Sequence, residues 1–118
     1  MIIDPTCIDP YTRRTVRVSM GEILHLPWAR ASSIEDAYDR LRGDGVDVWA
    51  LTPDRAADSL FDLTPPDRMA VVLGAEGPGL PDSTLRRADR RVRIPIEADV
   101  DSLNVAAAAA VALSHLRI

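Results

Sequence analysis

The chain has 118 residues, 47% of them hydrophobic, and a formal net charge of −4. That length suits one domain with a single core, and the charge argues against a strongly basic nucleic-acid-binding domain. No apolar run approaches the 18 residues of a membrane span, and the N-terminus lacks the basic and apolar parts of a signal peptide. The single cysteine, Cys7, cannot form an intramolecular disulfide. We therefore expect a reducing, cytoplasmic location and a buried, apolar role for Cys7.

The first third of the chain is predicted to contain the end of a strand and two helical segments. Residues 1–3 are apolar and stop at Asp4-Pro5, and residues 11–24 carry apolar side chains at helical spacing. The next helix is predicted to begin with a capping box formed by Ser33 and Asp36. Gly43 and Gly45 are expected to end it.

The remainder is predicted to alternate strands with helices. Strands are expected at residues 46–51, 69–73 and 91–96, and the proline-containing residues 52–67 are expected to be mostly loop. In the first of these strands, Val48 and Ala50 alternate with Asp47 and Trp49. A short helix capped by Asp82 is expected to reach residue 88, and a last helix, residues 102–116, is expected to be capped by Ser102. This order predicts an α/β fold with a mostly parallel sheet.

Two loops at the carboxyl ends of predicted strands carry most of the chemistry. The first contains Gly74, Gly77 and Gly79, which allow positive φ angles and a close approach of the backbone to a ligand. Its Glu76 has acceptors for the loop's own N–H groups or for a ligand. The second loop places Ser102 and Asn104 at the start of the last helix. Hydroxyl and amide groups suit a neutral, hydroxyl-rich ligand better than a free phosphate, which favours Arg or Lys.

Several other kinds of site are excluded by spacing. The order G-x-x-G-x-G differs from the dinucleotide fingerprint, and a P-loop is excluded because the chain has no lysine. His25 and His115 lack the spacing of metal ligands, so no metal site is expected. Ser102 has no nearby His/Asp partner for a hydrolase triad. Asp99 and Asp101 are interpreted as solvated loop residues.

The two loops closely resemble the motifs of the SpoU (TrmH) family of RNA ribose 2′-O-methyltransferases, of the SPOUT class. One motif reads Leu-Gly-Ala-Glu-Gly-Pro-Gly-Leu at residues 73–80. The other reads Ile-Pro-Ile at residues 94–96, then Asp-Ser-Leu-Asn-Val at residues 101–105, followed by an alanine-rich helix. The segment from Asp9 through Arg17-Val-Ser-Met-Gly to Pro27 is similar to the family's middle region. The resemblance therefore extends along nearly the whole chain.

The resemblance implies a SPOUT-type α/β knot, with a C-terminal trefoil knot, that binds S-adenosyl-L-methionine and methylates tRNA or rRNA without a metal. It implies a homodimer, for which the small side chains of residues 106–112 are suitable. The cofactor-binding residues would be Gly74, Gly77, Gly79, Ile94, Ile96 and Leu103. The catalytic residues would be Ser102, Asn104 and Glu76, and the RNA-binding residues would be Arg13, Arg14 and Arg17.

The chain departs from the family at its first motif, an Asn-x-Gly followed by an Arg that is thought to activate the ribose hydroxyl. Asn104 is the only asparagine, so the motif is missing. We expect residues 1–118 to be a single domain that lacks its first strand–helix unit, and Met1 is either the true start or an internal methionine. The alternative to an enzyme is a non-catalytic module that binds cofactor or RNA. A second group of arginines, residues 86–93, fits either a phosphate-binding surface or a solvated helix face.

Overall fold

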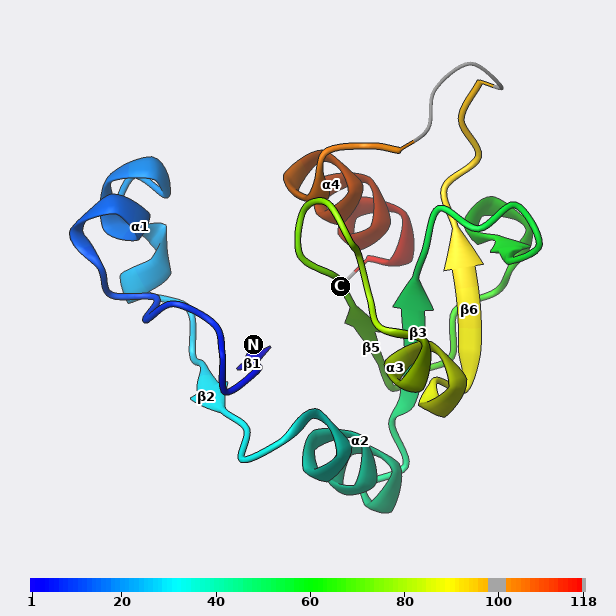
Figure 1. The fold of residues 1–118 in the computed structure, drawn as a ribbon, viewed down its shortest axis with the longest axis horizontal. Coiled ribbons are helices and arrows are strands. Elements are labelled where there is room, and N and C mark those ends of the chain that lie inside the picture. The colour runs from blue at the N-terminus through cyan, green and yellow to red at the C-terminus, as the bar shows by residue number, and fades with distance from the viewer. Residues whose placement is uncertain (98–101, 118) are drawn as a thin grey trace. The chain divides into compact units, whose positions relative to one another are not determined.

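The computed structural model describes residues 1–97 and 102–117 (Figure 1). The chain divides into two compact units, Met1–Asp39 and Arg40–Ile118. Residues 98–101, which include the predicted solvated residues Asp99 and Asp101, lie outside the described part of the chain. No helix in the described ranges is long and apolar enough to cross a membrane.

The N-terminal unit is held by a short parallel pair of strands, β1 (Ile2–Ile3) and β2 (Ala29–Arg30). A terminal guanidinium nitrogen of Arg30, Nη1, donates to the carbonyl oxygens of Asp4, Pro5 and Cys7 at 3.1, 3.1 and 2.7 Å. The Asp4 carboxylate also accepts from the Thr6 hydroxyl and backbone N–H, and these hydrogen bonds lower the pKa of Asp4. The turn after β1 is thereby fixed to β2.

The helical segment predicted at residues 11–24 is interrupted. It contains α1 (Arg13–Val18) and a 3₁₀ turn, η1 (Glu22–Leu24). Between them Met20 and Gly21 have φ angles of 54° and 87°, and this left-handed backbone cannot continue a right-handed helix. The prediction that Cys7 is buried was wrong, because Cys7 is exposed.

The helix predicted after Ser33 is confirmed as α2 (Ile34–Gly43). The Ser33 hydroxyl oxygen accepts from the Asp36 backbone N–H at 3.0 Å, as a capping box requires. The Asp36 carboxylate accepts from the Ser32 hydroxyl at 2.8 Å. Gly45 follows with a φ of 70°, which suits the residues after a helix.

The C-terminal unit is built on a fully parallel four-stranded sheet, which confirms the α/β prediction. Its spatial order is β4 (Asp58–Ser59), β6 (Arg90–Arg93), β3 (Asp47–Leu51) and β5 (Met69–Val72). Because β3 is central, both of its faces are covered: Val48, Trp49 and Ala50 are all at most 3% exposed. The alternation of residues 46–51 therefore does not separate a buried face from an exposed one.

The segment predicted as loop, residues 52–67, also contributes to the sheet and core. It contains β4 and a 3₁₀ turn, η2 (Leu60–Asp62), and Leu60 is fully buried. β4 pairs with β6, and the pairing joins Asp58 to Val92 and Ser59 to Arg93. A two-residue strand leaves too short a pattern for periodicity to detect.

Two helices complete this unit, α3 (Asp82–Arg87) and α4 (Val105–Leu116). Both predicted N-caps were wrong: Pro81 occupies the cap of α3, and Asn104 caps α4 in place of Ser102. The side chain of Asn104 accepts from the backbone N–H groups of Ala106 and Ala107 at 2.9 and 3.4 Å. From α4, Ala112 and Leu116 enter the core with Trp49, Leu60 and Val92.

Candidate active site

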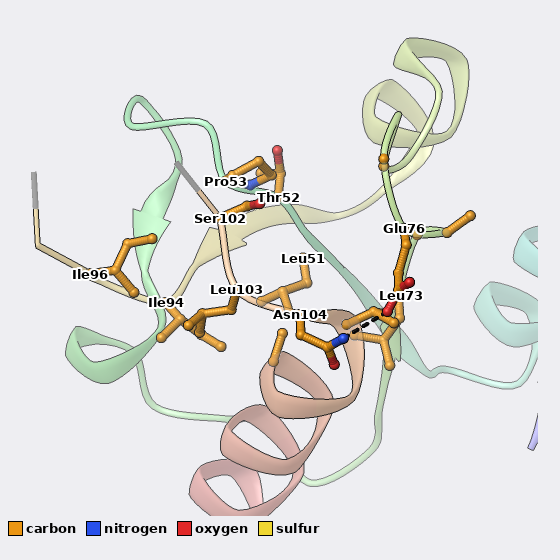
Figure 2. Close-up of a pocket in the computed structure, with 16 residues that line it drawn as sticks. Leu51, Thr52, Pro53, Leu73, Glu76, Ile94, Ile96, Ser102, Leu103 and Asn104 are labelled. Carbon is orange, nitrogen blue, oxygen red and sulfur yellow. Dashed lines mark hydrogen bonds between the residues drawn. The ribbon is translucent and has the colours of Figure 1, made fainter. Parts of the chain in front are cut away.

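A pocket of about 300 Å³ lies at the carboxyl ends of β3, β5 and β6, beside the N-terminus of α4 (Figure 2). Parallel strands end at the same edge of a sheet, and open α/β folds place ligands there. The lining residues come from three loops and the first turns of α4: Leu51, Thr52, Pro53, Leu73, Gly74, Ala75, Glu76, Gly77, Gly79, Ile94, Ile96, Ser102, Leu103, Asn104, Val105 and Ala108. Every residue predicted to bind cofactor or to take part in catalysis is among them.

The glycine-rich loop folds back on itself after β5. Ala75 and Gly79 form an antiparallel bridge, and Gly77 and Gly79 have φ angles of 89° and 70°. These two positions confirm the expected positive φ angles. Gly74 has a different role. A Cβ atom there would lie 2.6 Å from both the Gly79 carbonyl carbon and the Leu80 nitrogen, so Gly74 permits close approach of the loop's own backbone.

The two motif loops are joined by a hydrogen bond from the Asn104 side-chain amide to Glu76. Asn104 Nδ2 donates to Glu76 Oε1 at 2.8 Å, as Figure 2 shows. The same Asn104 side chain caps α4 through Oδ1. One amide thus connects the loop after β5 to the helix start. Asn104 is a partner of Glu76 that was not considered from the sequence.

Much of the remaining pocket lining is apolar. Ile94 and Ile96 continue from β6, and Leu103 precedes the α4 cap. Leu73, Ile96 and Leu103 are each 36% exposed, which is a high exposure for large apolar side chains that face one concave site. In Figure 2, Ser102 lies beside Thr52 and Pro53, on the side of the pocket away from Glu76. The pocket therefore offers apolar contact area with polar groups at separate positions.

A third loop of the pocket was missed from the sequence. Leu51 ends β3, Thr52 and Pro53 follow it, and all three line the site. The Thr52 N–H donates to the Val92 carbonyl at 2.9 Å, and the Thr52 hydroxyl oxygen accepts from the Asp54 N–H at 3.3 Å. These bonds hold Thr52 at the end of the sheet with only 9% exposure. The available signal was its place directly after an apolar strand, the same signal that identified the other two loops.

The lining favours an organic ligand of mixed polarity. A pocket near 300 Å³ with apolar walls and a few placed polar groups is typical of small-molecule and cofactor sites. S-adenosylmethionine fits this donor set, because backbone groups of the glycine loop suit its hydroxyls and Ile94, Ile96 and Leu103 suit an aromatic base. Within residues 1–97 and 102–117, no cluster of three His, Cys, Asp or Glu side chains could hold a metal ion.

The three arginines expected to bind RNA lie together in α1, within the N-terminal unit. Arg13, Arg14 and Arg17 are all exposed. Arg14 lies three residues before Arg17, and Arg13 lies four residues before it. At these spacings, side chains are neighbours on a helix surface. The structure thus brings the three positive charges together on one short helix.

The second arginine group is partly used to hold the sheet. Arg90 forms an ion pair with Asp58 at 2.9 Å, and Arg93 Nε donates to the Ala57 carbonyl at 3.2 Å. Both contacts join β6 to the segment around β4. They favour a structural role for these two arginines over phosphate binding.

Comparisons with known proteins agree with the two motif loops. The model of the SpoU rRNA Methylase family matches residues 1–114. A tRNA/rRNA methyltransferase of Mycobacterium bovis, itself uncharacterized, is 46% identical over 109 residues, covering 90% of this chain and 38% of that protein. The 23S rRNA (guanosine(2553)-2′-O)-methyltransferase of Bacillus subtilis is 29% identical over 109 residues, covering 92% and 43%.

The fold comparison gives the same result. The crystal structure of an AdoMet-bound rRNA methyltransferase from Sinorhizobium meliloti superposes with a TM-score of 0.87 and 32% identity, covering 98% of this chain and 44% of that one. The chain thus spans about two-fifths of the length of these relatives. The family match over residues 1–114, together with the parallel sheet and the paired motif loops, places this chain in the SpoU rRNA Methylase family.

Proposed function

We propose that this chain binds S-adenosyl-L-methionine and acts in the 2′-O-methylation of a ribose in tRNA or rRNA. The observation that carries the proposal is the pocket in which the glycine loop and the α4 cap are joined by Glu76 and Asn104. Further support comes from the 23S rRNA 2′-O-methyltransferase and the AdoMet-bound structure to which the chain is similar.

The cofactor would be held largely by backbone and apolar groups. Gly74, Gly77 and Gly79 shape the loop, while Ile94, Ile96 and Leu103 supply contact area. When bound, S-adenosylmethionine supplies an electrophilic methyl group. The pocket walls would exclude water from the reacting end and restrict its orientation, and positioning of this kind supplies much of the acceleration in a bimolecular transfer.

The chain's polar residues would organise the acceptor side. The ribose hydroxyl is a weak nucleophile that must lose its proton in the transition state. We assign Ser102 to orient polar groups at the reacting end, and we assign Asn104 and Glu76 to hold the two loops at a fixed separation through their 2.8 Å hydrogen bond. The proton leaves to a base or to water.

We assign RNA binding to Arg13, Arg14 and Arg17 because phosphate contacts require exposed positive side chains. We also infer a homodimer and a C-terminal trefoil knot, as family membership implies. Exposed apolar side chains on α4, which a second copy of the chain could cover, support the dimer. They are Ala106, Ala107, Ala110, Val111 and Leu113. Light scattering that gives a monomer at every concentration would contradict the dimer.

A second candidate function is binding without transfer. Asn104 is the only asparagine of these 118 residues, so they do not contain the Asn-x-Gly motif that precedes the activating Arg in the family. A module of this kind would bind cofactor or RNA without turnover. Misplacing a reacting group by 1 Å lowers the rate on the order of 100-fold. The arginines of α1 are therefore poor replacements for the activating Arg.

The experiment is a tritium-transfer assay on total tRNA and rRNA, combined with calorimetry of S-adenosylmethionine binding. Tritium incorporation supports 2′-O-methylation if the labelled RNA resists base hydrolysis at the methylated nucleotide. Saturable one-site binding without incorporation supports the second candidate. Absence of both, with a demonstrably folded chain, contradicts the proposed function.

A further inference from the structure

An aromatic pair lies beside the arginine-rich helix α1 in the N-terminal unit. The rings of Tyr11 and Trp28 meet edge to face, with their centroids 5.4 Å apart and an angle of 70° between their planes. Tyr11 is 52% exposed, whereas Tyr38 and Trp49 are buried. In an edge-to-face pair, the edge of one ring meets a face of the other. At least one face of the Tyr11 ring is therefore not covered by Trp28.

The backbone at Tyr11 is fixed by a turn, and its partner Trp28 is fixed by a strand. The Tyr11 N–H donates to Asp9 Oδ1 at 2.8 Å, and the Thr12 N–H donates to the Asp9 carbonyl oxygen at 3.1 Å. Trp28 directly precedes β2, which pairs with β1. The exposed ring is thus pre-organised, so that a ligand binding to it loses less affinity to the ordering of the protein.

The positive side chains of α1 begin two residues after this ring. Thr12 caps α1, and Arg13, Arg14 and Arg17 follow in the helix. All three arginines are exposed, and none forms an ion pair with a carboxylate of the residues that the structure describes. Two residues of chain span at most about 7 Å, which limits the distance between the Cα atoms of Tyr11 and Arg13. An open aromatic face and three cations therefore share one small surface.

We propose that Tyr11 stacks on a base of single-stranded RNA while the arginines of α1 contact the neighbouring phosphates. This inference rests on the proposed function and adds a base-binding position to its RNA-binding surface. Proteins that hold single strands combine positive surfaces with aromatic side chains, because every base has a flat face that can stack. Bases in a duplex are already stacked on one another. The site therefore favours unpaired nucleotides.

The charge of the whole chain gives stacking a larger part here than in a basic RNA-binding domain. The chain has a formal net charge of −4, so its overall field does not attract a phosphate backbone. Local contacts must then supply the affinity, and an aromatic ring that stacks on one base supplies a contact of useful size. We expect removal of the Tyr11 ring to weaken the binding of a single strand by about tenfold.

The test is fluorescence anisotropy with two labelled probes of about ten nucleotides. One probe is an oligouridine, and the other is an abasic oligomer with the same sugar–phosphate backbone. Tyr11→Leu removes the ring and should weaken oligouridine binding by about tenfold, but abasic binding by less than about twofold. Tyr11→Phe keeps the ring and should bind oligouridine within about twofold of the wild type. Arg14→Gln removes a phosphate contact and should weaken the binding of both probes.

Phe61→Leu is the matched control. Phe61 is 48% exposed and meets the His115 ring edge to face, as Tyr11 meets Trp28, but it lies in the C-terminal unit. This variant should bind both probes as the wild type does. A second measurement is NMR of the Tyr11 ring in the wild-type chain. Oligouridine should move the ring proton signals upfield, because a stacked base shields them, and the abasic oligomer should not.

Equal weakening of both probes by Tyr11→Leu would overturn the proposal, because the ring would then only hold α1 in place. Unchanged oligouridine binding in Tyr11→Leu, or equal losses in Tyr11→Leu and Tyr11→Phe, would overturn it as well. If Tyr11→Leu does not fold, the wild-type ring signals decide, and the absence of an upfield shift contradicts stacking. Failure of the wild-type chain to bind either probe is a different result, which also contradicts the RNA-binding part of the proposed function.

Discussion

At the scale of single residues, the sequence identified Gly74 as part of a functional loop but did not show why this position requires glycine. The glycine-rich pattern after an apolar strand predicted a functional loop, and the pocket includes it. The expected reason was space for a ligand or a positive φ angle. The contacts that exclude a side chain at Gly74 come from the backbone of residues 79 and 80, which no local pattern reveals.

Gly74→Ala should therefore act through the loop. A Cβ atom 2.6 Å from two backbone atoms forces the Ala75–Gly79 bridge to open. We expect a loss of about 1–3 kcal/mol in the free energy of unfolding, as for other overpacked sites, together with weakened cofactor binding. Urea unfolding and calorimetry measure the two effects. Gly43→Ala is the control, because nothing lies within 4 Å of the added atom; equal behaviour of the two variants would refute the steric argument.

Asp4 provides a pH-dependent prediction. The Thr6 hydroxyl, followed by the Thr6 N–H, lowers the pKa of Asp4 below its ordinary 3.8. Because the folded pKa is lowered, the stabilisation is present above the ordinary value and is lost as the pH falls through the folded pKa. Thr6→Ala removes the largest cause and should raise the pKa of Asp4 toward its ordinary value. NMR titration of the Asp4 carboxyl carbon measures this, and an unchanged midpoint would show that the hydroxyl contributes nothing.

At the scale of helices and strands, α4 was predicted with the right end, Leu116, but with the wrong cap and with a start at residue 102 in place of Val105. Ser102 and Asn104 are both good N-cap residues, so the sequence alone could not choose between them. In the structure Asn104 Oδ1 reaches two N–H groups while its Nδ2 reaches Glu76. That third contact is made across 28 residues of sequence, which explains why a local rule missed it.

The cap assignment can be tested with matched alanine variants. Asn104→Ala should lower the free energy of unfolding by about 1 kcal/mol, because α4 loses its cap. Ser102→Ala should change it by less than about 0.5 kcal/mol, because Ser102 lies outside the helix. Urea denaturation of both variants measures the difference. A larger cost for Ser102→Ala would restore Ser102 as the cap.

At the scale of the whole molecule, the order of elements predicted a mostly parallel sheet, and the structure confirms it for the C-terminal unit. The spatial order β4-β6-β3-β5 could not be predicted, because it depends on crossovers and on a two-residue strand. Trp49 was placed opposite the apolar residues of its strand. Its burial follows from the central place of β3, which only the assembled sheet shows. The same assembly adds Thr52 to the site, because it brings a third strand end to the two that the motifs mark.

Binding of S-adenosylmethionine in this pocket is tested by an NMR titration of the ¹⁵N-labelled chain. We expect saturable, one-site shifts of the amides of Thr52, of residues 102–105 and of residues 74–80 other than Pro78, because these line or adjoin the pocket. The amides of Thr6 and Arg30, in the N-terminal unit, should not respond. A folded chain whose spectrum is unchanged at millimolar ligand, or whose shifts fall in the N-terminal unit and spare the pocket, would contradict the assignment of this site.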